Sequence, residues 1–225
     1  MTDDATRLYL LRHAEVASHQ GDVPITDLGE RQARRAGEWL AQQNVDAAAV
    51  LYGGTRRTRE TAEGIVESLA AAGHAGAADL VPRDSFALRN PDLYLAGERV
   101  TMVSGADRYA EQVPQLSADE VTAVPFFATW LTHPERVGFW VAHEDPPGDT
   151  AATVARRIAT FARSLADAAA WRGRAVVAVT HSPILRAVAR DTFGEDPGEP
   201  EYLSGFEYTV LRNGTHTVSR VRPSI

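Results

Sequence analysis

The sequence predicts an α/β protein, a three-layer α/β/α sandwich around a mostly parallel central sheet. First, three short apolar runs, Leu8–Leu11, Ala47–Tyr52 and Ala175–Thr180, have the pattern of strands buried on both faces. Second, segments with helical signals follow these runs, and an alternation of strands and helices is typical of parallel sheets. Third, a chain of 225 residues without a long linker or an internal repeat forms most simply one domain, residues 1–225.

Composition narrows the classes of partner. Hydrophobic residues make up 44% and charged residues 24% of the chain, as in ordinary globular proteins. The net charge of −7 argues against a general nucleic-acid or anionic-membrane surface. The chain contains no run of 18 apolar residues, no signal-peptide pattern at its start and no cysteine for disulfides or thiolate metal sites. We therefore expect a cytoplasmic protein without nucleic-acid or membrane partners, and the sequence leaves monomer and homodimer open.

The amino-terminal half contains two expected strand-helix units. After the first strand and a polar loop, Thr26 or Asp27 can cap a helix that runs to about Gln43 with an apolar stripe along one side. The second strand ends at two glycines, and the helix after it continues towards Ala71. A short strand is expected within residues 80–88. The first turn of the second helix carries three arginines, Arg56, Arg57 and Arg59.

Residues 86–148 interrupt the strand-helix alternation. A capping box at Ser117–Glu120 predicts a helix through about Leu131. The stretch 86–140 also holds eight of the 17 aromatic residues. We interpret residues 86–148 as an insertion packed over the carboxyl edge of the sheet, where it could serve as a lid or pocket wall. The alternative is a helical decoration with a small core of its own.

The carboxyl-terminal part returns to regular elements. Residues 146–150 break the chain and cap a helix that should run to about Ala170. His181 directly follows the strand Ala175–Thr180, and the sequence predicts a further helix from Pro183 to Phe193. Residues 206–211 and 215–221 form an expected β-hairpin, with residues 212–214 in a type I′ turn.

Polar side chains gather where these strands end. Arg12 and His13 follow the first strand, His181 follows the strand Ala175–Thr180, and Arg57 begins the helix after the second strand. Carboxyl ends of parallel strands meet at one edge of the sheet, so these residues should lie together. Guanidinium groups bind phosphate oxygens in a bidentate fork, and a neutral imidazole can attack phosphorus. A lone histidine is more often structural, but this combination indicates phosphate chemistry.

The chain resembles the histidine phosphatase superfamily, which has a phosphoglycerate mutase-like fold. Three motifs carry the resemblance: Arg12-His13-Ala14 after an apolar strand, Ile25-Thr26-Asp27-Leu28-Gly29-Glu30-Arg31-Gln32-Ala33, and Arg57-Thr58-Arg59-Glu60-Thr61-Ala62. A later apolar strand ends in a second histidine, as it does in the family. The resemblance implies that His13 becomes phosphorylated, that Arg12, Arg57 and His181 hold the phosphoryl group, and that water then hydrolyses the phosphohistidine. Neither a metal nor another cofactor is expected.

One departure from the family concerns the general acid. Many members carry Leu-x-Glu where this chain has Leu88-Arg89-Asn90, and asparagine cannot protonate a leaving group. We favour Asp92 as the substitute, with Asp84 and Glu15 as the alternatives; an enzyme without such an acid is also open. A second departure is the glycine pair after the second strand, where the family usually has serine.

The resemblance therefore implies a phosphatase, a metal-independent phosphoric monoester hydrolase that acts on a small phosphorylated metabolite. Candidate substrate contacts are His19, Arg89 and Phe127. Two alternatives stay open, a phosphatase for phosphohistidine and a catalytically weakened binding or regulatory member of the same fold. The sequence does not identify the substrate.

Overall fold

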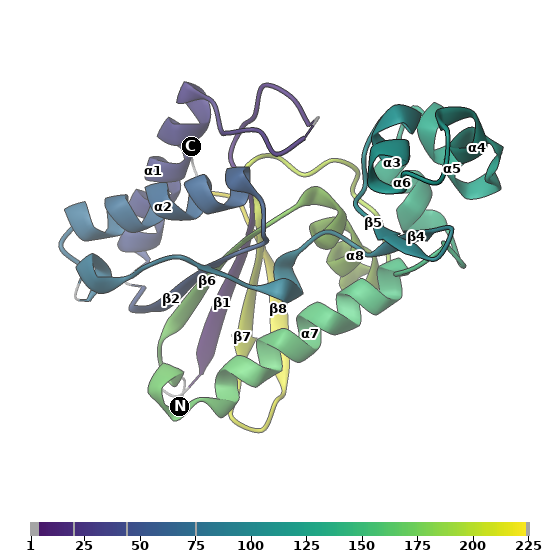
Figure 1. Ribbon diagram of the computed structural model, residues 1–225. Coiled ribbons are helices and arrows are strands. Elements are labelled where there is room, and N and C mark those ends of the chain that lie inside the picture. Colours follow the sequence, from purple (N-terminus) through teal and green to yellow (C-terminus); the bar gives the residue numbers. More distant parts are fainter. Residues whose placement is uncertain (1–4, 20, 44, 75, 224–225) are drawn as a thin grey trace.

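The computed structural model describes residues 5–19, 21–43, 45–74 and 76–223 and shows the expected layers of helices around a central sheet (Figure 1). The sheet has six strands in the order β3-β2-β6-β1-β7-β8. Four neighbouring strands are parallel, and β7 and β8 continue the sheet as an antiparallel hairpin. The strands are β1 (Thr6–Arg12), β2 (Ala47–Tyr52), β3 (Arg83–Asp84), β6 (Ala175–Thr180), β7 (Gly205–Val210) and β8 (His216–Val221).

The central strands are buried on both faces, which explains their uninterrupted apolar sequences. Side chains of a strand alternate between the two faces of a sheet. Accordingly, Leu8 and Leu10 of β1 belong to one hydrophobic cluster, and Tyr9 and Leu11 belong to the other. The mostly parallel α/β architecture predicted from the sequence is therefore confirmed.

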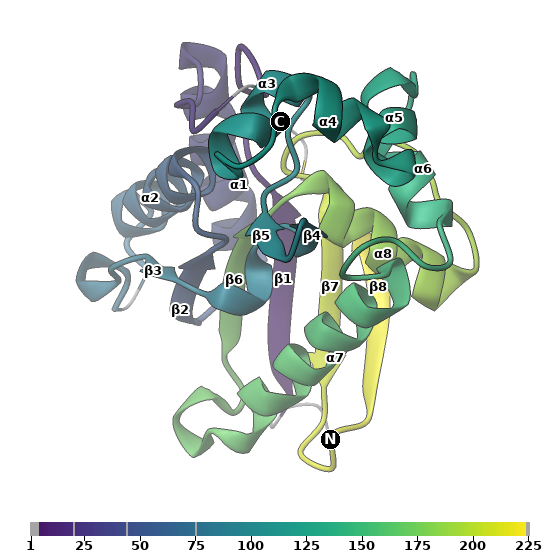
Figure 2. The same cartoon turned by 45° about the vertical axis from the view of Figure 1, so that its right-hand side comes forward.

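Helices cover both faces of the sheet, as Figures 1 and 2 show. On one face lie α1 (Asp27–Gln42) and α2 (Arg56–Ala71), and on the other lie α7 (Ala151–Asp167) and α8 (Ser182–Phe193). The predicted caps are present, because the hydroxyls of Thr26 and Thr150 accept the amide hydrogens of Gly29 and Thr153 at 3.0 and 3.1 Å. None of the described helices has the length and apolar character needed to span a membrane.

The segment between β3 and α7 forms a group of short elements beyond the carboxyl edge of the sheet (Figure 2). They comprise β4 (Leu93–Leu95), β5 (Glu98–Val100), α3 (Ala106–Gln112), α4 (Ala118–Ala123), α5 (Pro125–Thr132) and α6 (Arg136–Ala142). Their aromatic residues join the same hydrophobic cluster as the sheet face beneath α7, so this segment has no separate core among the described residues. Single 3₁₀ turns occur at Ala77–Asp79, Phe86–Leu88 and Ala169–Trp171.

Two local predictions are wrong. The helix expected from the capping box at Ser117 ends at Ala123, and α5 begins at Pro125. Val124 between them is extended (φ −78°, ψ 120°), because the proline ring disfavours helical backbone in the residue before it. The turn between β7 and β8 is not of type I′, since of residues 212–214 only Gly214 has a positive φ, +82°. This is a three-residue loop that closes with a left-handed glycine.

Candidate active site

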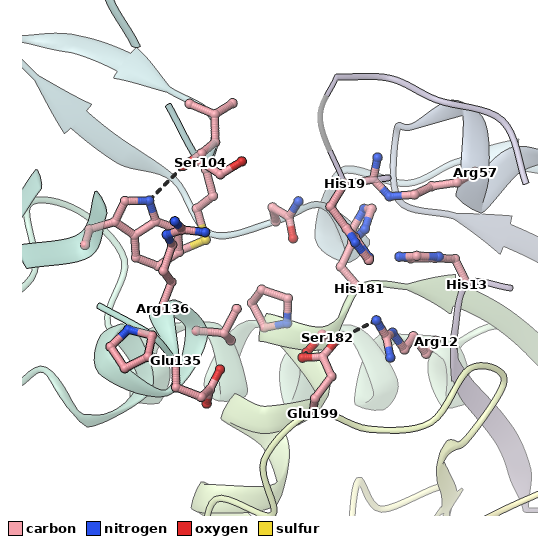
Figure 3. A pocket seen from close by; sticks show the side chains of 17 residues that line it. Arg12, His13, His19, Arg57, Ser104, Glu135, Arg136, His181, Ser182 and Glu199 are labelled. Atoms are coloured by element: carbon pink, nitrogen blue, oxygen red, sulfur yellow. Dashed lines mark hydrogen bonds and ion pairs between the residues drawn. The ribbon is translucent and has the colours of Figure 1, made fainter. Parts of the chain in front are cut away.

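A cavity of about 310 Å³ opens at the carboxyl ends of β1 and β6 (Figure 3). One side of it is built from the ends of these strands and the starts of α2 and α8, and the other side from the segment between β5 and α6. The lining residues are Arg12, His13, His19, Arg57, Asn90, Met102, Val103, Ser104, Trp130, Pro134, Glu135, Arg136, Val137, His181, Ser182, Pro183 and Glu199. The structure thus brings together the two histidines and two arginines that the sequence analysis singled out.

His13 is oriented by its own backbone. Its amide donates to the Thr180 carbonyl at 2.9 Å, which fixes the chain beside β6. Its ring Nδ1 lies 2.7 Å from the Ala14 carbonyl oxygen, and a carbonyl only accepts, so Nδ1 carries the hydrogen. The other nitrogen, Nε2, therefore keeps a lone pair. Burial, and then the charges of His181, Arg57 and Arg12, hold the pKa of His13 well below its usual range. This imidazole is neutral near pH 7, as a nucleophile must be.

His181 lies at the N-cap of α8, with its ring centroid 5.6 Å from that of His13. Its Nε2 is 3.1 Å from the Gly53 carbonyl oxygen, whereas Nδ1 is buried without a hydrogen-bond partner among the described residues. Burial and the nearby Arg57 lower the pKa of His181 to about 3. An anion in the cavity would reverse that effect and let Nδ1 bind a proton and donate it to an oxygen.

Arg12 is almost completely buried, with 4% of its side chain exposed. One Nη pairs with the Glu199 carboxylate at 2.5 Å, and the other donates to the Pro200 carbonyl. The guanidinium carbon lies 4.3 Å from the centroid of the Tyr202 ring, a cation–π contact. These contacts hold the guanidinium in place at the cavity, with Nε unpaired among the described residues.

Arg57 and His19 complete this side of the cavity. Arg57 is the second residue of α2, and its Nη1 donates to the Gly21 carbonyl at 3.4 Å, while its Nε is buried and unpaired among the described residues. The His19 ring lies 5.9 Å from the His13 ring, centroid to centroid. Two guanidinium groups and three imidazoles therefore surround one point, an arrangement suited to a phosphoryl group.

The opposite wall contains residues that sequence reasoning did not place. Arg136, one of several arginines of the inserted segment, faces the cavity, with its Nη2 donating to the Leu131 carbonyl at 3.2 Å. Trp130 also lines the cavity and donates from Nε1 to the Val103 carbonyl at 2.8 Å. Glu135, on this wall, and Glu199, beside Arg12 on the other side, were missed altogether, because nothing local in their loops distinguishes them from surface glutamates. In Figure 3 this wall stands across the cavity from His13 and Arg12.

The carboxylic acids expected near the cavity do not line it. The Asp92 carboxylate pairs with Arg99, and its backbone amide is fixed by the Asp149 carboxylate at 3.0 Å. Asp84 pairs with Arg89, and the Glu15 carboxylate accepts the Thr26 hydroxyl at 2.6 Å beside the start of α1. Each carboxylate thus has a partner away from the cavity, while the Asn90 amide lines it.

Two expected substrate contacts also lie elsewhere. Phe127 is completely buried and packs against Tyr109 with ring centroids 4.8 Å apart, because its helix turns this apolar face to the hydrophobic cluster. Arg89 points away to its ion pair with Asp84 and packs over Gly54. Among the described residues, no three His, Asp or Glu side chains are grouped so that they could hold a metal ion.

Comparison with known proteins agrees with the geometry. The profile of the histidine phosphatase superfamily (branch 1) matches residues 8–75, the part that contains β1, α1, β2 and α2. No protein of curated function matches the sequence significantly.

Solved structures resemble almost the whole chain. A mycobacterial glucosyl-3-phosphoglycerate phosphatase has 18% identity and a TM-score of 0.59, covering 97% of this chain and 99% of that one. A phosphoglycerate mutase from Bacillus anthracis has 17% identity and a TM-score of 0.61 (98% and 94%). The product of an open reading frame of Mycobacterium tuberculosis has 24% identity and a TM-score of 0.54 (97% and 97%).

At such identities these structures establish the fold alone, and the motifs of the amino-terminal third add the link to the family. The resemblance seen in the sequence is confirmed: residues 8–75 match the histidine phosphatase superfamily, and the chain has the phosphoglycerate mutase-like fold.

Proposed function

We propose that the chain is a phosphatase that hydrolyses a small phosphorylated metabolite through a phosphohistidine on His13, without a metal ion. The observation that carries this proposal is the orientation of the His13 ring. Its Nδ1 donates to the Ala14 carbonyl, so that Nε2 has its lone pair free, and Arg12 and Arg57 lie close enough to lower its pKa. A buried neutral nucleophile between two guanidinium groups matches what phosphoryl transfer needs, which is positioning and charge stabilisation.

The phosphoryl group would be held by donors that lack partners in the described structure. The Nε atoms of Arg12 and Arg57 and the Nδ1 atom of His181 are buried and unpaired there. An unsatisfied buried polar group costs about 1–3 kcal/mol. Phosphate oxygens would satisfy both guanidinium donors, and the negative charge would favour protonation of His181 so that it donates as well. A bound phosphoryl group would thus pair donors that the described residues leave unpaired.

The cavity supports a small organic substrate. Its volume of about 310 Å³ lies at the lower end of ligand pockets. On the far wall Arg136 offers a cation to the part of the substrate beyond the phosphate, and Trp130 also lines this wall. The mycobacterial relative named above is a phosphatase for glucosyl-3-phosphoglycerate, and we propose for this chain the same general class, a phosphorylated metabolite with a polar or anionic remainder.

A second candidate is a phosphatase for phosphohistidine or for another phosphoryl group whose leaving group needs little protonation. Asn90 in the cavity favours it, because an amide cannot supply the proton that an alkoxide requires. The size of the inserted segment argues against it, since a long wall beyond the phosphate site suits a sizeable leaving group.

The nucleophile is tested with His13→Ala and His13→Asn. We expect both variants to fold and to lose hydrolysis of p-nitrophenyl phosphate by at least about 10³-fold, because nothing else in the cavity is placed to attack phosphorus. Wild-type protein that carries acid-labile ³²P on His13 when the reaction is quenched would support the intermediate. Undiminished turnover in a folded His13→Ala variant would show that the mechanism is wrong. Retention of activity after exhaustive chelation is the accompanying expectation.

A further inference from the structure

The two carboxylates of the cavity are both held by arginines. Glu135 pairs with the buried Arg186 at 2.5 Å, and hydrogen bonding to Arg186 lowers the pKa of Glu135. Glu199 pairs with Arg12 at 2.5 Å, and its second oxygen accepts the Ser182 hydroxyl at 2.6 Å. The contact with Arg186 favours the ionised form of Glu135, and both oxygens of Glu199 are already engaged by Arg12 and Ser182. Neither carboxylate is therefore suited to protonate a leaving group.

His19 is placed differently. Its loop is tied to the start of α2, where the Gly21 carbonyl accepts from Arg57 at 3.4 Å and the Asp22 carboxylate accepts the Arg56 amide at 2.6 Å. The His19 ring lies 5.9 Å from the His13 ring, centroid to centroid, and no hydrogen bond joins it to another described residue. It is thus a positioned imidazole whose ring nitrogens are not committed within the described structure.

The position of His19 relative to the reaction axis follows from the cavity walls. In an in-line displacement the leaving oxygen departs on the side opposite the attacking Nε2 of His13. That direction leads towards the inserted segment, which forms the opposite wall (Figure 3). The His19 loop borders this wall, because Ser18 and Gly21 line a neighbouring hollow together with Val103 and Ser104. His19 therefore lies beside the phosphate end of the cavity, on a loop that reaches the opposite wall.

We propose that His19 is the general acid that protonates the leaving-group oxygen, in the role that the superfamily pattern would give to a glutamate at Asn90. This inference rests on the proposed phosphatase function. In the first step the Nε2 lone pair of His13 forms the N–P bond, the P–O bond breaks with its electron pair on oxygen, and His19 gives that oxygen its proton. In the second step water attacks phosphorus, its proton returns to His19, and the N–P electron pair returns to His13.

The surrounding charges would make this proton available at the right time. The groups that face His19 are Arg12 and His13 from the β1 end, Arg57 from α2, His181 from α8 and Glu199 from the loop before β7. Burial, and then Arg12 and Arg57, lower the pKa of His19 in the empty site. A dianionic phosphate neutralises both guanidinium groups and adds negative charge, so the pKa of His19 rises when substrate binds.

The test compares two substrates of nearly equal size, p-nitrophenyl phosphate and phenyl phosphate, with His19→Gln. Phenoxide is the more basic leaving group and depends more on protonation. We expect kcat/KM, which reports the phosphoryl-transfer step, to fall by about 10²-fold or more for phenyl phosphate. For p-nitrophenyl phosphate the loss should stay within about threefold. With phenyl phosphate the wild-type kcat should also decrease at basic pH as the acid loses its proton, and His19→Gln should lose that decrease.

Two controls keep the outcomes distinct. His216→Gln, at the opposite end of the sheet, should leave both substrates unchanged. Equal losses on both substrates with His19→Gln, or a selective loss with Glu199→Gln instead, would overturn the assignment. If the wild-type protein shows no phosphatase activity that is lost on replacing His13, the proposed function itself is wrong. If the wild-type protein is active but His19→Gln slows both substrates equally, only the role of His19 is wrong.

Discussion

At the scale of single residues, the site depends on backbone groups that hold side chains in one orientation. The Gly53 carbonyl binds His181 Nε2, and a Cβ added at Gly53 would clash with the carbonyl of Leu88. Gly54 has a φ of +74°, where other residues are strained. The glycine pair, which departs from the serine usual in the family, is thus required by the close approach of the Leu88 turn.

We therefore expect Gly53→Ser to lower the free energy of unfolding by about 2 kcal/mol, the usual cost of overpacking. Activity should fall as well, since the carbonyl that orients His181 must move. Urea unfolding and p-nitrophenyl phosphate turnover measure the two effects, with the exposed Ala72→Ser as the matched control. A Gly53→Ser protein of unchanged stability and activity would show that the Leu88 turn can move to make room for the side chain without measurable cost.

Asp92 allows a prediction opposite to the one that its place in the sequence suggested. Because its carboxylate pairs with Arg99 and does not line the cavity, Asp92→Asn should lower kcat/KM for phenyl and p-nitrophenyl phosphate by the same small factor, within about threefold. A loss confined to phenyl phosphate would restore Asp92 as the acid and would require the loop to move.

At the scale of elements, the inserted segment determines the far wall of the cavity. Its short helices α5 and α6 and the turn between them bring Trp130, Arg136 and Glu135 to the lining, whereas Phe127 anchors the segment in the hydrophobic cluster. The Thr180 hydroxyl at the end of β6 donates to the Leu88 carbonyl at 2.7 Å. This hydrogen bond fixes the start of the inserted segment to the residue that precedes His181. We propose that this wall selects the substrate, which is the lid or pocket-wall role expected from the sequence.

Replacement of Arg136 tests that role. Arg136→Ala should lower kcat/KM at least about tenfold for substrates with a second anionic group, because one charge-assisted hydrogen bond contributes about 1.5–3 kcal/mol. Hydrolysis of p-nitrophenyl phosphate should change little. The matched control is Arg108→Ala, an exposed arginine of the same segment that pairs with Glu111 and does not line the cavity. Equal slowing of every substrate would make Arg136 a structural residue.

The sequence predicted what local rules determine. Buried apolar runs marked β1, β2 and β6, and side-chain caps marked the starts of α1 and α7. Arg12, His13, Arg57 and His181 could be grouped because parallel strands place their carboxyl ends together. The positions of Asp92 and Phe127 could not be predicted, since each depends on which face of the insertion packs inward. Glu199 lies far from β1 in sequence and meets Arg12 only through the tertiary fold.

At the scale of the whole molecule, two buried neutral histidines link folding to pH. His13 and His181 are each about 2% exposed, and both have pKa values below the unfolded value near 6.5. Below that pH the unfolded chain binds protons that the folded chain does not. The contribution of these neutral histidines to the free energy of unfolding is therefore fully present above about pH 6.5. It is lost as the pH falls towards the folded pKa values.

Between about pH 6 and pH 4, His181 alone should reduce the free energy of unfolding by about 1.4 kcal/mol for each pH unit. His181→Asn should flatten the pH dependence by that slope, whatever its effect at pH 7. Urea unfolding at several pH values in a phosphate-free buffer measures both slopes. Parallel curves for wild type and variant would mean that His181 is protonated in the folded protein.

The ion pair between Arg12 and Glu199 has a kinetic consequence. A carboxylate that is part of the chain occupies a guanidinium group that the substrate also needs, and so it acts as a tethered competitor with a high effective concentration. A phosphate dianion must loosen this contact before Arg12 can bind it fully, so part of the intrinsic affinity for phosphate is masked. Glu199→Gln should therefore tighten inhibition by inorganic phosphate several-fold and slow the release of product phosphate. The native carboxylate would thus help phosphate to leave the cavity after each turnover.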